Sequence, residues 1–196
     1  MRDSIVVPVY IAEMAPSKVV VPVDESRVAL CTRVQSVPHD FFGEPVGRCG
    51  DDVWVRVRVG VRAFLDIDRR VAKLPPTASG LLREGWWPRQ HAVHFAGNPD
   101  IGPDDKLYAV VADDDWNGAP GTSYTAAVRL TSRTKAQRRR RWEVPVGDGW
   151  VVSGDLYSVA YSRFEQTPPR GRYPKRVSAD EGAGIATRQQ TTLNLR

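Results

Sequence analysis

The strongest candidate for chemistry in this chain is a basic run between two strand-like segments. Lys135 is followed by four consecutive arginines, Arg138–Arg141, and then by Trp142. Adjacent guanidinium groups repel one another and cannot be buried without partners, so one interpretation is a solvated loop. The other is contact with phosphate or carboxylate groups, to which guanidinium donates paired hydrogen bonds. The residues predicted to bind an anionic partner are Arg56, Arg58, Arg62, Lys135, Arg138, Arg139, Arg140 and Arg141.

A second candidate is an acidic stretch that resembles the opening of a calcium loop. Asp113, Asp115 and Asn117 stand at alternate positions and Gly118 follows, which supplies three oxygen ligands and a turn. The twelfth position of the loop requires a bidentate carboxylate and is Tyr124 here, so the pattern is incomplete. Asn-Gly is also a strong turn dipeptide, and a β-turn is the favoured interpretation.

Histidines and cysteines are too scattered to predict a metal site. His91 and His94 are three residues apart, a spacing that puts them on opposite faces of a strand. Cys31 and Cys49 are too few for a disulfide scaffold, and free buried thiols are expected. No nucleophile elbow, phosphate-binding loop or dinucleotide fingerprint is found. The prediction is therefore no catalytic residue, no metal and no cofactor.

The elements that must position these groups are predicted mainly from one alternating segment, residues 53–67. Valines and other apolar residues occupy one parity, and Trp54, Arg56, Arg58 and Arg62 fall on the other. Successive side chains of a strand point to opposite faces, so the pattern predicts a long strand with one buried and one basic face. On this interpretation Val57 and Val59 are both buried.

Many short Val-rich segments separated by turn residues predict an all-β fold. The chain has 15 prolines and 16 glycines, and turn signals recur along it. Neither a sustained helical period nor an internal repeat is evident, which argues against a parallel α/β sheet. We predict one domain over residues 1–165, an antiparallel sandwich or jelly-roll-like barrel.

The last segment, residues 166–196, is poor in large apolar side chains and is predicted to be an extended C-terminal arm. Such an arm can bury little of its own surface, so it is expected to cross onto another chain. Its predicted subunit-contact residues are Tyr173, Val177, Ile185, Leu193 and Leu195.

Composition limits the function without fixing it. The net charge is +5, with basic residues concentrated over 129–141 and aspartates over 100–115. No stretch is long and apolar enough for a membrane span, so no membrane partner is expected.

The prediction is a non-enzymatic structural or assembly subunit that contacts other protein subunits in an oligomer. A virus or phage particle component fits, located in the virion or cytoplasm. The alternative is a nucleic-acid-binding β-barrel that uses the basic face and the arginine loop. A calcium- or sugar-binding sandwich and an enzyme with a scattered active site also stay open.

Overall fold

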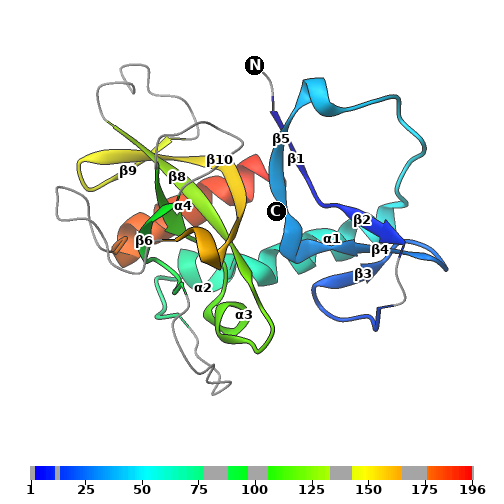
Figure 1. The fold of residues 1–196 in the computed structure, drawn as a ribbon, viewed down its shortest axis with the longest axis horizontal. Helices are drawn as coiled ribbons and strands as arrows, with labels where there is room; N and C mark the ends of the chain where they lie inside the picture. Colours follow the sequence, from blue (N-terminus) through cyan, green and yellow to red (C-terminus); the bar gives the residue numbers. More distant parts are fainter. Residues whose placement is uncertain are drawn as a thin grey trace.

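The computed structural model describes residues 3–11, 14–76, 88–96, 106–132, 143–164 and 176–195. Its largest sheet has five antiparallel strands in the order β6-β7-β8-β10-β9 (Figure 1). Their bounds are β6 Val93–Ala96, β7 Lys106–Val110, β8 Tyr124–Ser132, β9 Glu143–Val146 and β10 Gly149–Ala160. A bulge between Val151 and Leu156 bends β10, so this strand meets β8 in two separate registers.

The amino-terminal part forms two smaller antiparallel sheets. One has the order β2-β4-β3, and the other pairs β1 with β5. The bounds are β1 Asp3–Val6, β2 Val9–Ile11, β3 Val20–Pro22, β4 Arg27–Leu30 and β5 Gln35–Pro38. Short 3-10 helices, η1 Cys31–Arg33 and η2 His39–Phe41, precede and follow β5. The antiparallel, β-rich character of the fold is therefore confirmed.

Four α-helices complete the described fold, so the all-β class is wrong. They are α1 Asp51–Phe64, α2 Ile67–Val71, α3 Asp114–Gly118 and α4 Ala179–Thr192. A further 3-10 helix, η4 Tyr161–Arg163, follows β10. The sandwich or jelly-roll arrangement is not established by the described strands, and neither is the boundary at residue 165; both stay predictions.

The predicted long strand over residues 53–67 is wrong, because most of it is helix α1. Val53, Val57, Val61 and Phe64 follow one another at intervals of four or three and are buried. Residues at this spacing form one apolar face of a helix. Val53, Val57 and Val61 also belong to the alternating set, so the two patterns overlap. Val59, on the same strand parity as Val57, is 57% exposed. The helix therefore buries Val57 and leaves Val59 in solvent.

The predicted extended arm is also wrong for the described residues 176–195. Ser178 caps α4 by accepting from the Glu181 backbone N–H, while Glu181 accepts from the Ser178 N–H, which is a full capping box. The helix packs on α2, β9 and β10 of its own chain. Four of the predicted subunit contacts, Val177, Ile185, Leu193 and Leu195, are buried in the core. Tyr173 lies outside the described residues.

One main core joins both parts of the chain. It combines the inner face of the five-stranded sheet with α1, α4 and the amino-terminal strands. Ser36 on β5 donates to the carbonyl of Gly154 and accepts from the Leu156 N–H at 3.1 Å, which ties β5 to the bulge of β10. Among the described residues, no helix has the length and apolarity needed to cross a membrane.

Candidate nucleic-acid interface

The outer face of the five-stranded sheet, which points away from the main core, carries a second set of buried side chains. Along β8, Ala126, Val128 and Leu130 point into the main core. Ala127 and Arg129 alternate with them and therefore point outward. A second, smaller apolar cluster lies on this outer face and consists of Tyr108, Val110, Ala127, Val159, Tyr161 and Phe164. The outer face is thus apolar at one end, and its polar groups begin at Arg129.

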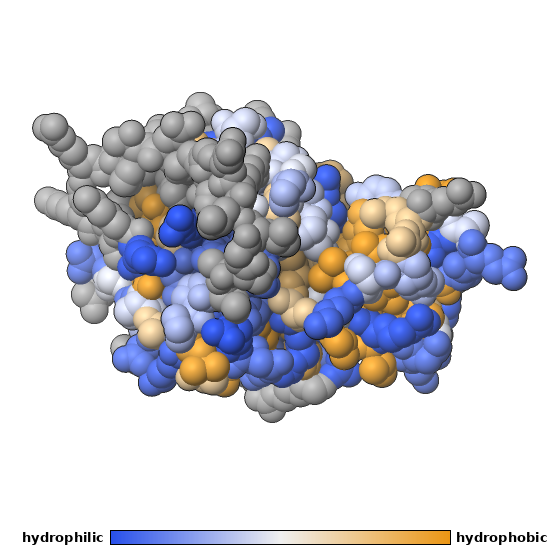
Figure 2. Space-filling view, turned by 90° about the horizontal axis from the view of Figure 1, so that it is seen from below, coloured by the Kyte–Doolittle hydropathy of each residue, from blue (hydrophilic) through white to orange (hydrophobic). Residues whose placement is uncertain are grey.

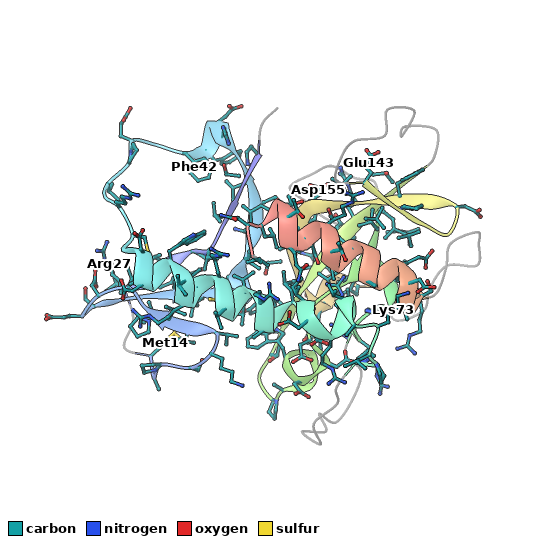
Figure 3. The ribbon with its side chains drawn as sticks, turned by 180° about the vertical axis from the view of Figure 1, so that it is seen from behind. Met14, Arg27, Phe42, Lys73, Glu143 and Asp155 are labelled. Carbon is teal, nitrogen blue, oxygen red and sulfur yellow. The ribbon has the colours of Figure 1, made fainter. Side chains whose placement is uncertain are left out.

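Three polar side chains meet beside this cluster. An Arg129 guanidinium nitrogen, Nη2, lies 3.2 Å from Asp155 Oδ2, and the Tyr157 hydroxyl donates to Asp155 Oδ1 at 2.9 Å. The Tyr157 ring stands edge-on to the Tyr108 ring, with centroids 5.5 Å apart. Tyr108 lies directly opposite Arg129 across the β7–β8 ladder. We call Tyr108, Arg129, Asp155 and Tyr157 the outer-face cluster; Asp155 is labelled in Figure 3.

Burial sets the electrostatics of the outer-face cluster. The side chains of Arg129 and Asp155 are 28% and 16% exposed. Burial, followed by the negative charge of Asp155, raises the pKa of Tyr157, so its phenol stays protonated and donates. Arg129 Nε is buried and has no hydrogen-bond partner among the described residues. An incoming anion can therefore reach only the exposed part of the guanidinium, since 28% of the Arg129 side chain is accessible to solvent.

The basic run joins the sheet at the same end as Arg129. Strand β8 ends at Ser132, β9 begins at Glu143, and Ser132 and Gly149 are opposite each other where β10 starts. Strand β7 begins and β6 ends at this end too, because Tyr108 pairs with Arg129 and Ala96 with Lys106. Lys135 and Arg138–Arg141 belong to the connection between β8 and β9 and lie outside the described residues.

The arginines predicted on a strand face are instead spread around helix α1. Arg56 pairs with Asp52 at 3.3 Å, one helical turn away. Arg62 pairs with Asp68 and donates to the carbonyl of Leu195. Helix α1 packs against η1, β3 and α2. The structure therefore does not bring Arg56, Arg58 and Arg62 into one face with Arg129.

The acidic stretch that resembled a calcium loop forms the short helix α3. Asp113 caps it by accepting from the Asp115 N–H at 3.3 Å. Asn117 is buried; its amide donates to the Ala112 carbonyl, and its Oδ1 accepts from Thr125 at 2.7 Å. In the part of the chain that the structure describes, no three His, Cys, Asp or Glu side chains are grouped to hold a metal ion.

A buried polar cluster that the sequence did not indicate lies between α2, α4 and the start of β6. Arg70 is 1% exposed and donates to Gln189 Oε1 at 2.9 Å and to backbone carbonyls. Burial lowers its pKa to about 10. His91 sits in the left-handed region at φ 66°, and a Cβ at Gly182 would lie 2.6 Å from its ring. This close approach leaves no room for a ligand, so the cluster is structural.

The two cysteines differ in environment. Cys31 is buried as expected, and burial raises the pKa of its thiol to about 11. Cys49 is exposed, so the expectation that both thiols are buried is wrong for this residue.

Sequence reasoning missed Arg129, Asp155 and Tyr157 as possible site residues. The segments 124–131 and 150–164 each have the composition of a strand. Asp155 and Tyr157 are two apart in the second, and Arg129 falls on the polar parity of the first, which is a usable signal. Nothing in the sequence shows that these two strands are neighbours. The pairing of β8 with β10 brings the three side chains together.

No protein-family model and no curated protein matches the sequence. Among solved structures, a mycobacterial endoribonuclease in complex with its cognate antitoxin is 22% identical, with a TM-score of 0.44. The match covers 56% of this chain and 97% of that one. A MazE-MazF structure from Deinococcus radiodurans is 20% identical, with a TM-score of 0.42, and covers 57% of this chain and 100% of the other. These likenesses concern the fold of about half of the chain.

The comparisons correct the predicted function. The solved proteins of similar fold are described as endoribonucleases or as MazE-MazF complexes, and an endoribonuclease is an enzyme. The predicted non-enzymatic structural or assembly subunit, and with it the virus or phage particle component, is therefore wrong. Some of these solved structures are complexes with a second protein, named in one case as an antitoxin.

Proposed function

We propose that this chain binds single-stranded RNA on the outer face of the five-stranded sheet and cleaves it there as an endoribonuclease. One observation carries the proposal: the partly exposed side chains of Arg129, Asp155 and Tyr157 meet beside Tyr108 and combine a cation, a carboxylate and a phenol. The endoribonuclease activity named for solved proteins of similar fold supplies the reaction to test first.

The outer-face cluster offers the two kinds of contact that a single strand requires. The Arg129 guanidinium neutralises and binds a phosphate, and the partly buried ring of Tyr157 packs against a base without regard to sequence. Tyr108 is 1% exposed, so its ring supports Tyr157 from below and does not itself contact RNA. Lys135 and Arg138–Arg141 begin a few residues beyond Arg129 on the same chain segment. The net charge of +5 favours a polyanion as the partner. Arg56, Arg58 and Arg62 stay a prediction as additional contacts.

The cleavage step can be written with these groups. The 2′-hydroxyl of the bound nucleotide attacks the adjacent phosphorus, and Asp155 accepts its proton. A bond forms between the 2′-oxygen and phosphorus while the bond from phosphorus to the 5′-oxygen breaks. Arg129 stabilises the negative charge that develops on the phosphate oxygens, and the Tyr157 hydroxyl gives its proton to the leaving 5′-oxygen. The products are a 2′,3′-cyclic phosphate and a free 5′-hydroxyl.

Binding and cleavage are tested separately on the full chain. Fluorescence anisotropy with a labelled single-stranded RNA measures affinity, and a denaturing gel follows strand cleavage. Arg129→Gln removes a charged hydrogen-bond donor worth about 2 kcal/mol, so it should weaken binding by about tenfold or more. Asp155→Asn should lower the cleavage rate by about a hundredfold while RNA still binds, because the amide cannot accept the proton.

The matched control is Arg27→Gln, which removes the same charge from an exposed residue of β4, labelled in Figure 3. It should change affinity by less than about twofold, as is usual for a cation outside the contact surface. Thermal melting of each variant checks that it is folded. Equal losses of affinity for Arg27→Gln and Arg129→Gln would show only general charge attraction. Binding without cleavage by the wild-type chain would remove the endoribonuclease part of the proposal.

A further inference from the structure

The chain contains the same arrangement of strands twice. In the amino-terminal part Ala29 on β4 pairs with Val9 on β2 and with Val21 on β3. In the carboxy-terminal part Val151 on β10 pairs with Leu130 on β8 and with Val144 on β9. The order β2-β4-β3 thus repeats as β8-β10-β9. Residues 21–23 and 144–146 even share the sequence Val-Pro-Val.

The elements that follow these strands repeat as well. Val6 on β1 pairs with Gln35 on β5, and Ala127 on β8 pairs with Tyr157 on β10. The β1–β5 pair therefore corresponds to the part of the β8–β10 pair that lies beyond the bulge of β10. Each part then has a three-residue 3-10 helix, η2 or η4, followed by a phenylalanine, Phe42 or Phe164. The N–H of each phenylalanine donates at 3.1 Å to the first residue of its 3-10 helix.

The two units also end in the same way. Helices α1 and α4 both have 14 residues. Each is followed by a buried leucine, Leu65 or Leu193. A residue in the left-handed conformation comes next, Asp66 at φ 48° or Asn194 at φ 51°. We therefore define unit 1 as residues 3–67 and unit 2 as residues 88–195, two copies of one structural unit.

The two units differ at one sheet edge. In unit 2, β7 covers the edge of β8 opposite β10. In unit 1 the matching edge belongs to β1 and β2, and no described strand pairs with it. Leu130 on the covered edge is 6% exposed, whereas its counterpart Val9 is 49% exposed and Ile11 is 85% exposed. Apolar side chains gather over the end of the molecule that holds β2, β3 and β4 (Figure 2).

Backbone groups that no described strand pairs with point out of this edge. The Pro8 carbonyl accepts from the Leu30 N–H at 3.1 Å, so the backbone groups of position 8 face β4. Proline has no backbone N–H, and this missing donor therefore lies on the paired side of the strand and not on the open side. Backbone groups of successive strand residues point to opposite sides, so those of Val7 and Val9 face outward. An uncovered apolar edge of this kind is a template for another strand.

We infer that the β1–β2 edge is a strand-addition site that takes an extended, apolar segment of a partner protein in antiparallel orientation. The occupant has the character of β7, with apolar residues at alternate positions, because β7 fills the same place in unit 2. The site lies in unit 1 and does not use the outer-face cluster, so it is independent of the proposed RNA cleavage.

The probe is a fluorescein-labelled peptide with the sequence of residues 106–112, and anisotropy measures its binding to the full chain. In the fold, Val111 N–H donates to Ala126 of β8 and Val110 N–H donates to Ala92 on the other side. Ala109 N–H therefore faces β8. N-methylation at Ala109 should weaken peptide binding by about tenfold or more, because it removes one hydrogen bond and blocks close approach. N-methylation at Val110 should change it by less than about twofold.

Two protein variants locate the peptide. Val9→Lys puts a charge on the open edge and should reduce binding by about tenfold, whereas Val59→Lys on exposed α1 should have no effect. Equal binding of both methylated peptides, or of Val9→Lys and wild type, would overturn the inference. A second result would also overturn it: the peptide fails to bind, and analytical ultracentrifugation shows a dimer that Val9→Lys dissociates. The occupant of the edge would then be a second copy of this chain.

Discussion

At the scale of single residues, several buried polar groups shape the molecule although the sequence does not mark them. Arg70, Gln189 and His91 are all at least nine-tenths buried. Arg70 bonds to Gln189, and the His91 ring packs against Gly182, so each contact joins residues far apart in the chain. Their positions in the sequence resemble those of ordinary surface residues. The same holds for Arg129 and Asp155, whose contact requires two strands to be neighbours. The pattern of residue types along the chain does not show which distant segments become neighbours in the fold.

His91 gives a pH-dependent prediction. Burial, and then the charges of Arg70 and Arg176, lowers its pKa to about 4 from the ordinary 6.5. The unfolded chain therefore binds more protons between these values, and the stabilisation that His91 contributes is present above about pH 6.5 and is lost as pH falls toward 4. The loss approaches about 3 kcal/mol. Urea unfolding from pH 7 to pH 4 should show it.

The control for this prediction is His91→Asn, which does not titrate and tolerates the left-handed conformation. Asp113 acts in the opposite direction in the same range, because burial and neighbouring carboxylates raise its pKa to about 6. The informative quantity is therefore the difference between wild type and variant. If that difference is the same at pH 7 and pH 4.5, the ring is not held neutral by burial.

At the scale of elements, the alternating valines of residues 53–67 show how a sequence pattern can fit two periods. Positions 53, 57, 61 and 64 satisfy a helix, and positions 53, 55, 57 and 59 satisfy a strand. Val is a poor helix former in isolation. Contact with η1 and β3 decides the outcome: Gly60 lets the helix approach so closely that a Cβ there would lie 2.6 Å from Cys31 Sγ and from the Lys18 carbonyl.

The segments after residue 90 were predicted better, because their alternation has no competing helical spacing. The Val-rich segments 92–95, 107–112, 124–131, 142–146 and 150–164 predict strands, and the structure has β6, β7, β8, β9 and β10 there with small shifts, except that residues 161–163 form η4. The helix α4 was missed because small and polar residues, such as Ala183, Ala186 and Gln189, supply much of its buried face. Periodicity of large apolar residues cannot reveal such a face.

A pair of substitutions separates helix from strand over residues 53–67. Val57→Asp should destabilise the protein by about 3 kcal/mol or more, because it places an unpaired charge in the core. Val59→Asp should change the free energy of unfolding by less than about 0.5 kcal/mol, since Val59 is exposed. Chemical denaturation measures both. Similar large losses for the two variants would favour the strand.

At the scale of the whole molecule, the two units share one core, so neither should be stable alone. The carboxy-terminal helix belongs to that core through Ile185 and Ala186. Arg62 of unit 1 also donates to the carbonyl of Leu195 in unit 2. The sequence shows no repeat because few residues are identical between the units; the common architecture appears in strand register and helix ends.

Truncation after Arg170 should therefore prevent cooperative folding. The cut removes six buried apolar residues of the described chain: Val177, Ala183, Ile185, Ala186, Leu193 and Leu195. Each large aliphatic side chain contributes about 1.5–3 kcal/mol, and the whole domain has only about 5–15 kcal/mol of stability. Circular dichroism and thermal melting should show a loss of the unfolding transition. A control chain that lacks only Arg196 should melt like the full chain, and a cooperative transition in the truncated chain would show that α4 is dispensable.

The contact of Ser36 with Gly154 and Leu156 has a consequence for biosynthesis. Strand β5 leaves the ribosome long before the β10 bulge against which it packs has been translated. During that interval the nascent chain exposes the surface of β5 that will meet β10, in addition to the uncovered edge of β1 and β2. Chains in this condition are prone to wrong strand pairing. Slow translation between residues 40 and 150 would lengthen this vulnerable period and increase the demand for chaperones.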